Sequence, residues 1–194
     1  MSYLEKLKNK MAEKASSIPV THTIYPVVAS NVDIFNINSD IDPEQIVNSI
    51  RNFRATHEAS NTSNVKAWHS PWYLNDYSKD FDKLIKIVED KVLQCLSTPD
   101  PNIRKVECVE NWAIIYKKGD KTIRHKHRDQ YYSAVYYAKT EKNVAPLKFD
   151  NLNITPQTGM LICFPGWLWH QVPEITDDQE RICMAFNLNC MMIK

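Results

Sequence analysis

Glycine is scarce in this sequence of 194 residues, which contains only Gly119, Gly159 and Gly166. A glycine-rich phosphate-binding loop or a dinucleotide-binding fingerprint needs several glycines close together, because the backbone must approach the phosphates. Three glycines that are scattered along the chain cannot form such a motif. The sequence therefore excludes the commonest kinase, NTPase and NAD-binding sites.

Net charge, long apolar runs and regularly spaced cysteines are also missing. The formal net charge is +1, so neither nucleic acid nor an anionic membrane is expected as a partner. No apolar run reaches transmembrane length, and residues 1–17 lack the apolar core of a secretion signal. The five cysteines have no CxxC spacing. They are expected to be reduced thiols in a cytoplasmic protein.

Helical periodicity is found in the first half of the chain. Residues 41–54 are expected to form a helix that Asp42 caps and Pro43 begins. Residues 78–98 have a continuous apolar stripe and predict a second helix, capped by Ser78. Residues 1–17 are expected to form a short amphipathic helix or an arm, and residues 23–37 have the β-branched content of one or two strands.

Short β-like runs separated by turns fill the chain from Arg104 onward, which is typical of a barrel or sandwich. We therefore expect an α+β fold in which N-terminal helices support a double-stranded β-helix, that is, a jelly-roll or cupin-like barrel. The length suits one domain over 1–194. Within it we expect the N-terminal helix or arm over 1–17, helical support and loops over 18–103, and the barrel with the active site over 104–194.

Two histidines, His125 and His127, stand one residue apart in the β-like run 121–127. In a strand, residues i and i+2 point to the same face, so both imidazoles would be aimed together as metal ligands. His170, in "FPGWLWHQVPE", is the candidate third ligand from another strand. Three such ligands leave positions open for substrate and oxygen. The alternative is a solvated histidine pair and a core histidine bonded to a backbone carbonyl.

Arg181 begins the alternating apolar run "RICMAFNL". A buried arginine is unfavourable unless it meets an anion, and its planar guanidinium suits a carboxylate. A metal site combined with a carboxylate-binding arginine is typical of an enzyme that holds a small dicarboxylate on iron.

Four segments in order resemble the motifs of a known family. The H-x-H pair, then "SAVYYAK", "GMLICFPGWLWHQV" and "ERICMAFNLN", look like those of the Fe(II)/2-oxoglutarate-dependent dioxygenases. The resemblance is closest to the prolyl-hydroxylase-like group found in bacteria and in phages of marine bacteria. It covers about residues 106–189 and implies Fe(II), 2-oxoglutarate as cosubstrate and O2. His127 stands where the family usually has aspartate, as in its H-x-H branch.

The resemblance also implies roles for individual residues. The metal ligands, which are the catalytic residues, are matched by His125, His127 and His170. Arg181 matches the residue that binds the far carboxylate of 2-oxoglutarate, and Tyr137 matches a tyrosine that bonds the same carboxylate. Tyr116, nine residues before His125, matches a family tyrosine that precedes the first histidine. Cys183 stands where many relatives carry a serine, within the same cofactor-binding region.

Asp129 leaves a second ligand set open, namely His127, Asp129 and His170, which would restore the two-histidine, one-carboxylate arrangement. A hairpin turn expected between His127 and Ser133 would leave Asp129 close to the turn, where a short acid commonly forms the turn. We favour His125 over Asp129 as the ligand on this ground and on the register of the strand.

The sequence thus favours a non-haem iron hydroxylase that couples oxidative decarboxylation of 2-oxoglutarate, to succinate and CO2, to oxidation of a substrate. A peptide or small-molecule substrate is expected, without nucleic acid or membrane, in the cytoplasm of a cell or of a phage host. Two alternatives stay open: a three-histidine metal dioxygenase that uses no 2-oxoglutarate, and a non-catalytic barrel that binds a partner. The sequence specifies neither the substrate nor the oligomeric state.

Overall fold

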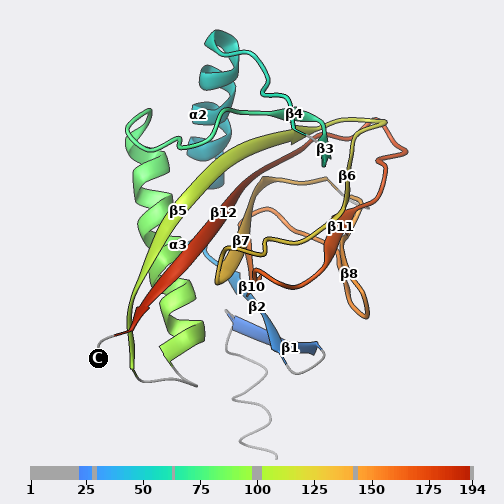
Figure 1. The fold of residues 1–194 in the computed structure, drawn as a ribbon. Helices are drawn as coiled ribbons and strands as arrows, with labels where there is room; N and C mark the ends of the chain where they lie inside the picture. The colour runs from blue at the N-terminus through green and yellow to red at the C-terminus, as the bar shows by residue number, and fades with distance from the viewer. Residues whose placement is uncertain (1–21, 28–29, 63, 98–101, 142–143, 193–194) are drawn as a thin grey trace, which may run out of the picture.

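A computed structural model describes residues 22–27, 30–62, 64–97, 102–141 and 144–192. The predictions for residues 1–17 and for the end of the second helix at 98–101 lie outside these ranges. Within the described part, two antiparallel sheets face each other and two helices cover the outer face of the larger sheet (Figure 1). Neither helix is long and apolar enough to cross a membrane. The expected α+β class is confirmed.

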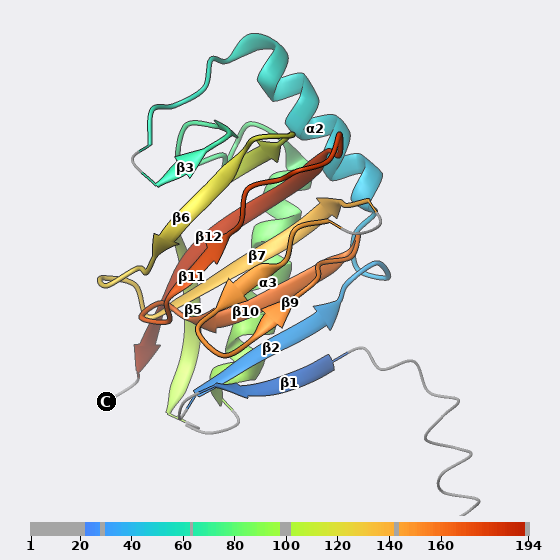
Figure 2. The ribbon, with the colours of Figure 1, turned by 90° about the vertical axis from the view of Figure 1, so that its right-hand side faces the viewer.

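The larger sheet has seven strands in the order β1-β2-β10-β7-β12-β5-β4. Their bounds are β1 His22–Val27, β2 Ser30–Asn36, β4 Trp68–His69, β5 Ile103–Tyr116, β7 Tyr132–Lys139, β10 Met160–Pro165 and β12 Arg181–Met192. The two longest strands, β5 and β12, pair along almost their whole length, from Arg181 opposite Tyr116 to Met192 opposite Ile103. The β5–β12 pair is thus the longest strand pairing of the larger sheet (Figure 2).

The smaller sheet has five strands in the order β3-β6-β11-β8-β9. Their bounds are β3 Val65–Lys66, β6 Lys121–His125, β8 Leu147–Phe149, β9 Asn153–Ile154 and β11 His170–Val172. The expected hairpin between the histidine segment and the following strand is wrong, because β6 and β7 belong to different sheets. Residues 126–131 therefore cross from the smaller sheet to the larger one.

Both faces of the larger sheet are buried, and this explains the composition of its strands. Alternate residues of β12 point in opposite directions: Ile182, Met184, Phe186 and Leu188 pack with the helices. Arg181, Cys183, Ala185 and Asn187 alternate with them and line the cavity between the sheets. The sequence of a strand that is buried on both faces is usually a continuous apolar run. The few polar residues on the inner face of β12 are therefore exceptions to this pattern.

The helices form where the sequence predicts them. Helix α2 (Pro43–Thr56) begins with Pro43 in its first turn, and the Asp42 carboxylate accepts a hydrogen bond from the Glu44 backbone N–H at 3.0 Å. Helix α3 (Lys79–Ser97) begins after Ser78, whose Oγ accepts from the Asp80 N–H at 3.2 Å. The apolar stripe of α2 packs on β7, and that of α3 packs on β5 and β7. The helices thus hold the larger sheet rigid from outside.

The barrel is not confined to the second half of the chain. Strands β1 and β2 extend the larger sheet beside β10, and β4 and β3 add one strand to each sheet at the opposite edges. The β-like composition of residues 23–37 indicated the first two of these strands. Strands β3 and β4 have two residues each, which is too short for hydrophobic alternation to be visible.

Candidate metal and cosubstrate site

Three histidines meet at one end of the cavity between the sheets. His125, the last residue of β6, lies directly opposite His170, the first residue of β11. The ring centroids of His125 and His170 are 4.2 Å apart, and those of His127 lie 5.1 and 5.3 Å from them. One nitrogen from each ring lies within 4.8 Å of the other two. The structure therefore brings together the three histidines that the sequence indicated.

His127 reaches this group by a route that strand geometry did not predict. Strand β6 ends at His125, so His127 is not the next inward residue of the same strand. Its backbone N–H donates to the Gly166 carbonyl at 2.8 Å, and the Gly166 N–H donates to the Tyr131 carbonyl at 3.1 Å. A Cβ on residue 166 would collide with the Gln130 carbonyl oxygen. Glycine at 166 thus lets the β10–β11 turn approach the 127–131 segment closely.

Two of the histidines have a fixed tautomer. The Nδ1 atoms of His125 and His170 lie 2.9 Å from the carbonyl oxygens of Ile123 and Leu168, respectively. A carbonyl only accepts, so each Nδ1 carries the ring proton and each Nε2 has its lone pair free. A backbone carbonyl on the outer nitrogen is the usual way in which proteins orient a metal-binding histidine.

Burial keeps the imidazoles uncharged. Desolvation, with the neighbouring His125, lowers the pKa of His127 to about 4. Burial lowers the pKa of His170 well below its ordinary value, and His125 adds to this; burial also lowers the pKa of His125. A metal ion binds the neutral imidazole. At neutral pH the site therefore has three uncharged imidazoles, and a set of three imidazole ligands fits Fe(II) with positions left open.

Arg181 lies in the same cavity and is 1% exposed. Its two terminal nitrogens donate to the Ala145 carbonyl and the Tyr137 hydroxyl, each at 3.0 Å, while its buried Nε–H has no hydrogen-bond partner in the part of the chain that the structure describes. The guanidinium also lies over the rings of Tyr116 and Tyr137, at 5.1 and 4.7 Å. Among the described residues, no carboxylate forms an ion pair with it. A buried cation with an unmet donor fits an anionic ligand.

The residues predicted around Arg181 are assembled there. Tyr137 and Cys183 are fully buried within the inner core cluster, and Tyr116 bonds the Thr122 hydroxyl at 2.7 Å. Burial raises the pKa values of Tyr137, Tyr116 and Cys183. All three side chains are therefore neutral at pH 7, and among the described residues that line the cavity Arg181 provides the one positive charge.

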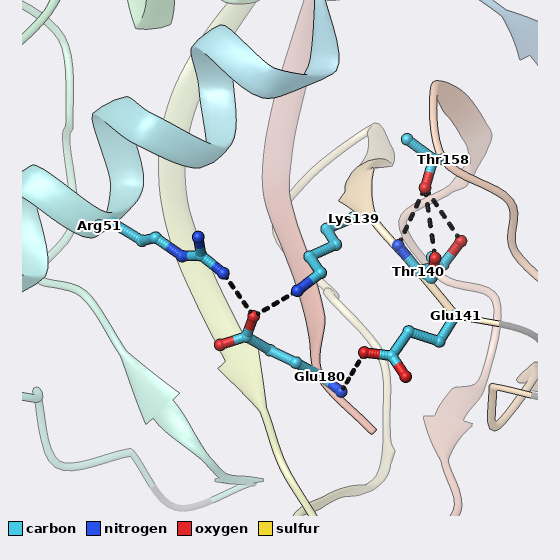
Figure 3. Close-up of polar contacts among 6 residues, drawn as sticks. All are labelled: Arg51, Lys139, Thr140, Glu141, Thr158 and Glu180. Atoms are coloured by element: carbon cyan, nitrogen blue, oxygen red, sulfur yellow. Dashed lines mark hydrogen bonds and ion pairs between the residues drawn. The ribbon is translucent and has the colours of Figure 1, made fainter. Parts of the chain in front are cut away.

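The residue before Arg181 fixes the start of β12 (Figure 3). One oxygen of Glu180 accepts from Arg51 of α2 at 2.7 Å and from Lys139 of β7 at 2.9 Å. Partial burial alone would raise the pKa of Glu180, but the hydrogen bonds from Lys139 and Arg51 lower it. Beside it, the Thr158 hydroxyl accepts from the Thr140 N–H at 3.0 Å. These contacts hold the strand ends next to Arg181.

Aromatic side chains form the wall beyond His127. Trp112 of β5 lies 6.2 Å from the His127 ring, and Trp72 packs edge-on against Trp112 at 4.5 Å. His69 is buried behind them and stacks on Trp112 at 5.7 Å. Trp72 is 41% exposed. His69 is therefore packed within this wall, and Trp72 lies at the cavity rim.

Asp129 lies outside the histidine group. It is exposed and borders a separate surface hollow with Arg128 and Trp167.

Two polar residues that the sequence did not single out lie close to His127. Asn187 is 3.2 Å from the His127 Nδ1, and Glu110 bonds Asn187 at 2.7 Å. The signal that could have found Asn187 is its position, since it lies on the same face of β12 as Arg181.

The comparisons with known proteins agree with this site. Residues 146–187 match the family model described as a putative 2OG-Fe(II) oxygenase, a segment that contains His170 and Arg181. No curated protein matches the sequence. The family match is therefore local, and the wider likeness is one of structure.

Solved structures with similar folds include two prolyl hydroxylases and the protein HygX. The viral collagen prolyl hydroxylase vCPH from Paramecium bursaria Chlorella virus-1, in its 2-oxoglutarate complex, is 16% identical, with TM-score 0.59 over 81% of this chain and 96% of that one. The prolyl hydroxylase from Trichoplax adhaerens, bound to a hypoxia-inducible factor peptide fragment, is 12% identical, with TM-score 0.62 over 97% and 94%. HygX from Streptomyces hygroscopicus, with nickel, 2-oxoglutarate and hygromycin B, is 10% identical, with TM-score 0.61 over 81% and 82%.

These likenesses confirm the double-stranded β-helix expected from the sequence. The family match and the three-histidine group support the same class, the 2-oxoglutarate- and Fe(II)-dependent oxygenases. The resemblance found in the sequence motifs is thereby confirmed, and it implies Fe(II), 2-oxoglutarate and O2 as the cofactors of such a site.

Proposed function

We propose that this protein is a hydroxylase in which His125, His127 and His170 hold Fe(II) and Arg181 binds 2-oxoglutarate. The observation that carries the proposal is that one cavity is lined both by three neutral histidines and by a buried arginine that forms no ion pair with any described residue. The first group suits a cation and the second suits an anion. A small dicarboxylate with a metal-chelating end meets both requirements.

Arg181 and Tyr137 would bind the far carboxylate together. The Tyr137 hydroxyl accepts a hydrogen bond from Arg181, so its own hydrogen is left to donate to a carboxylate oxygen. The unpartnered Arg181 Nε–H is a further donor. The apolar side chains on the inner faces of both sheets exclude water from the surroundings of Arg181, which strengthens the ionic contact. Tyr116 and Cys183 would shape the pocket around the ligand.

The metal and cosubstrate would supply the oxidising chemistry: with O2, 2-oxoglutarate is oxidised to succinate and CO2 while a substrate C–H bond is hydroxylated. The chain's part is to hold these groups in one orientation and to keep the site dry. Three neutral ligands bring no negative charge to the ion, unlike a set that contains a carboxylate. The dianionic cosubstrate would provide that charge, so we expect Fe(II) and 2-oxoglutarate to strengthen each other's binding.

The substrate would enter beside Trp72, at the exposed edge of the aromatic wall. A peptide fragment and hygromycin B are bound in two of the structural neighbours, and we propose a peptide or small molecule here. The five cysteines have no CxxC spacing, and we propose a reducing compartment, either a cell's cytoplasm or that of a phage host.

Replacement of Arg181 tests the cosubstrate assignment. Arg181→Ala should raise the dissociation constant for 2-oxoglutarate by about tenfold to a hundredfold, because a charge-assisted bond is lost, and should abolish succinate release while Fe(II) still binds. Calorimetry and succinate assays measure both. The exposed Arg104 provides the control variant Arg104→Ala, which should behave as the wild type.

A second variant covers the risk that loss of a buried charge unfolds the protein. Tyr137→Phe keeps the ring and removes only the hydroxyl, so we expect a weaker but measurable loss of 2-oxoglutarate affinity. Unchanged affinity in both variants would overturn the assignment and favour a three-histidine dioxygenase that uses no 2-oxoglutarate. Failure of the wild type to retain any metal would favour a non-catalytic barrel.

A further inference from the structure

The three histidines differ in the partner of the outer nitrogen. His125 and His170 donate from Nδ1 to backbone carbonyls. The Nδ1 of His127 instead lies 3.2 Å from the side-chain nitrogen of Asn187. The first two rings are thus fixed with Nε2 free, while the third faces a group that can itself donate.

Glu110 determines which way the Asn187 amide faces. The Asn187 Nδ2 is 2.7 Å from the Glu110 Oε2, and the Asn187 Oδ1 accepts from the Ser133 hydroxyl at 3.0 Å. A carboxylate only accepts, so the amide group beside it must be the NH2. That NH2 has two hydrogens, one for Glu110 and one for the His127 Nδ1.

An Nδ1 that accepts a hydrogen bond has its lone pair occupied, so the proton of the neutral ring is on Nε2. This is the opposite tautomer from that of His125 and His170. To bind a metal through Nε2, His127 must lose the Nε2 proton and gain one at Nδ1, with no net change in protons. Asn187 must then turn its oxygen toward Nδ1, which would set that oxygen against the Glu110 carboxylate.

We infer that Glu110, acting through Asn187, is a positioning residue that holds His127 in the tautomer that cannot bind metal and so lowers the metal affinity of the site. This inference rests on the proposed function, because it takes the three histidines as the ligands. Two ligands are preset, and the third becomes one only when the Glu110–Asn187 contact rearranges.

The variant Glu110→Gln tests this inference, which predicts that the substitution strengthens metal binding. A glutamine amide can donate to the turned Asn187 oxygen, which frees His127 to protonate Nδ1. We expect the affinity of the purified protein for Ni(II) alone to rise about tenfold, the lower end of the effects seen for groups that orient metal ligands. Loss of a merely structural contact would lower the affinity or leave it unchanged, and either result would overturn the inference. Glu107→Gln, on the same strand and paired with Lys105, should not change it.

The tautomers can be observed without metal. In nitrogen-15 NMR of the histidine-labelled, metal-free protein, His127 should have its proton on Nε2, and His125 and His170 should have theirs on Nδ1. Glu110→Gln should shift His127 toward the Nδ1–H form. A wild-type His127 already protonated on Nδ1 would overturn the inference. Because this readout needs no metal, it decides the inference even if the protein fails to act as an oxygenase.

A double-mutant cycle locates the effect in Asn187. Glu110 also accepts a longer bond from the Gln130 amide, at 3.5 Å. If its effect on His127 passes through Asn187, Glu110→Gln should have no effect on Ni(II) affinity in an Asn187→Ala background. An equal increase in both backgrounds would show that Glu110 acts directly through its charge, and would overturn the role given to Asn187.

Discussion

At the scale of residues, the site depends on groups kept in the charge state that their task requires. Three imidazoles, of which His170 is buried and His125 and His127 are half-buried, are uncharged at neutral pH, and the pKa of His127 is lowered to about 4. Arg181, in the same cavity, stays cationic, as guanidinium groups do in proteins. The cavity thus has neutral histidines because burial lowers their pKa values, and a positive charge because Arg181 stays protonated.

The stability of the metal-free protein should fall as the pH drops from about 6.5 to about 4. In this window unfolded histidine takes up a proton while folded His127 does not, because its pKa is about 4; unfolding therefore binds protons and acid favours it. Urea denaturation at pH 7.5 and pH 5 measures the loss. Its fall should be smaller in His127→Gln, and an equal fall in both proteins would contradict the lowered pKa.

Residue identities were predicted better than residue surroundings. The histidines, Arg181 and Tyr137 could be found because a polar residue in an apolar run, or an H-x-H pair, is visible in the sequence. Glu110 could not be found, because it is linked to His127 through Asn187, 77 residues further along the chain. Nothing in the local sequence indicates that pairing.

At the scale of elements, the histidine group is built by three segments from two regions of the chain. Strand β6 supplies His125, strand β11 supplies His170, and the crossing segment after β6 supplies His127. Both helices and most strands were predictable from periodicity. The crossing segment was not, because strand alternation suggested a hairpin and the backbone bond from His127 to Gly166 is a tertiary contact.

Gly166→Ala should therefore lower metal affinity as well as stability. The added methyl would collide with the Gln130 carbonyl and lie 3.0 Å from the His127 carbonyl oxygen, pushing the crossing segment away from His170. Overpacking of this kind destabilises proteins by about 1–3 kcal/mol. Urea denaturation and Ni(II) calorimetry measure the two effects.

Gly119→Ala is the matched control for this prediction. Gly119 has φ of +87°, so alanine is strained there, but no atom lies within 4 Å of the added methyl. It should lose stability without losing metal affinity. Equal loss of metal affinity in both variants would mean that the Gly166 contact does not position His127.

At the scale of the whole molecule, the two sheets have unequal tasks. The larger sheet is supported by α2 and α3 and carries Arg181 and Tyr137, while the smaller sheet carries His125 and His170 (Figure 1). The cavity lies between them. A ligand that bridged the histidines and Arg181 would therefore join the two sheets, which is why metal and cosubstrate are expected to bind cooperatively.

The most direct test of this account is an anaerobic titration of the Fe(II)-loaded protein with 2-oxoglutarate, followed by visible absorption. If the keto acid chelates iron held by the three histidines, a weak charge-transfer band should appear and saturate at one equivalent per chain. It should be absent from His170→Ala. If the wild-type protein binds no Fe(II), or if 2-oxoglutarate produces no band, the central claim is contradicted.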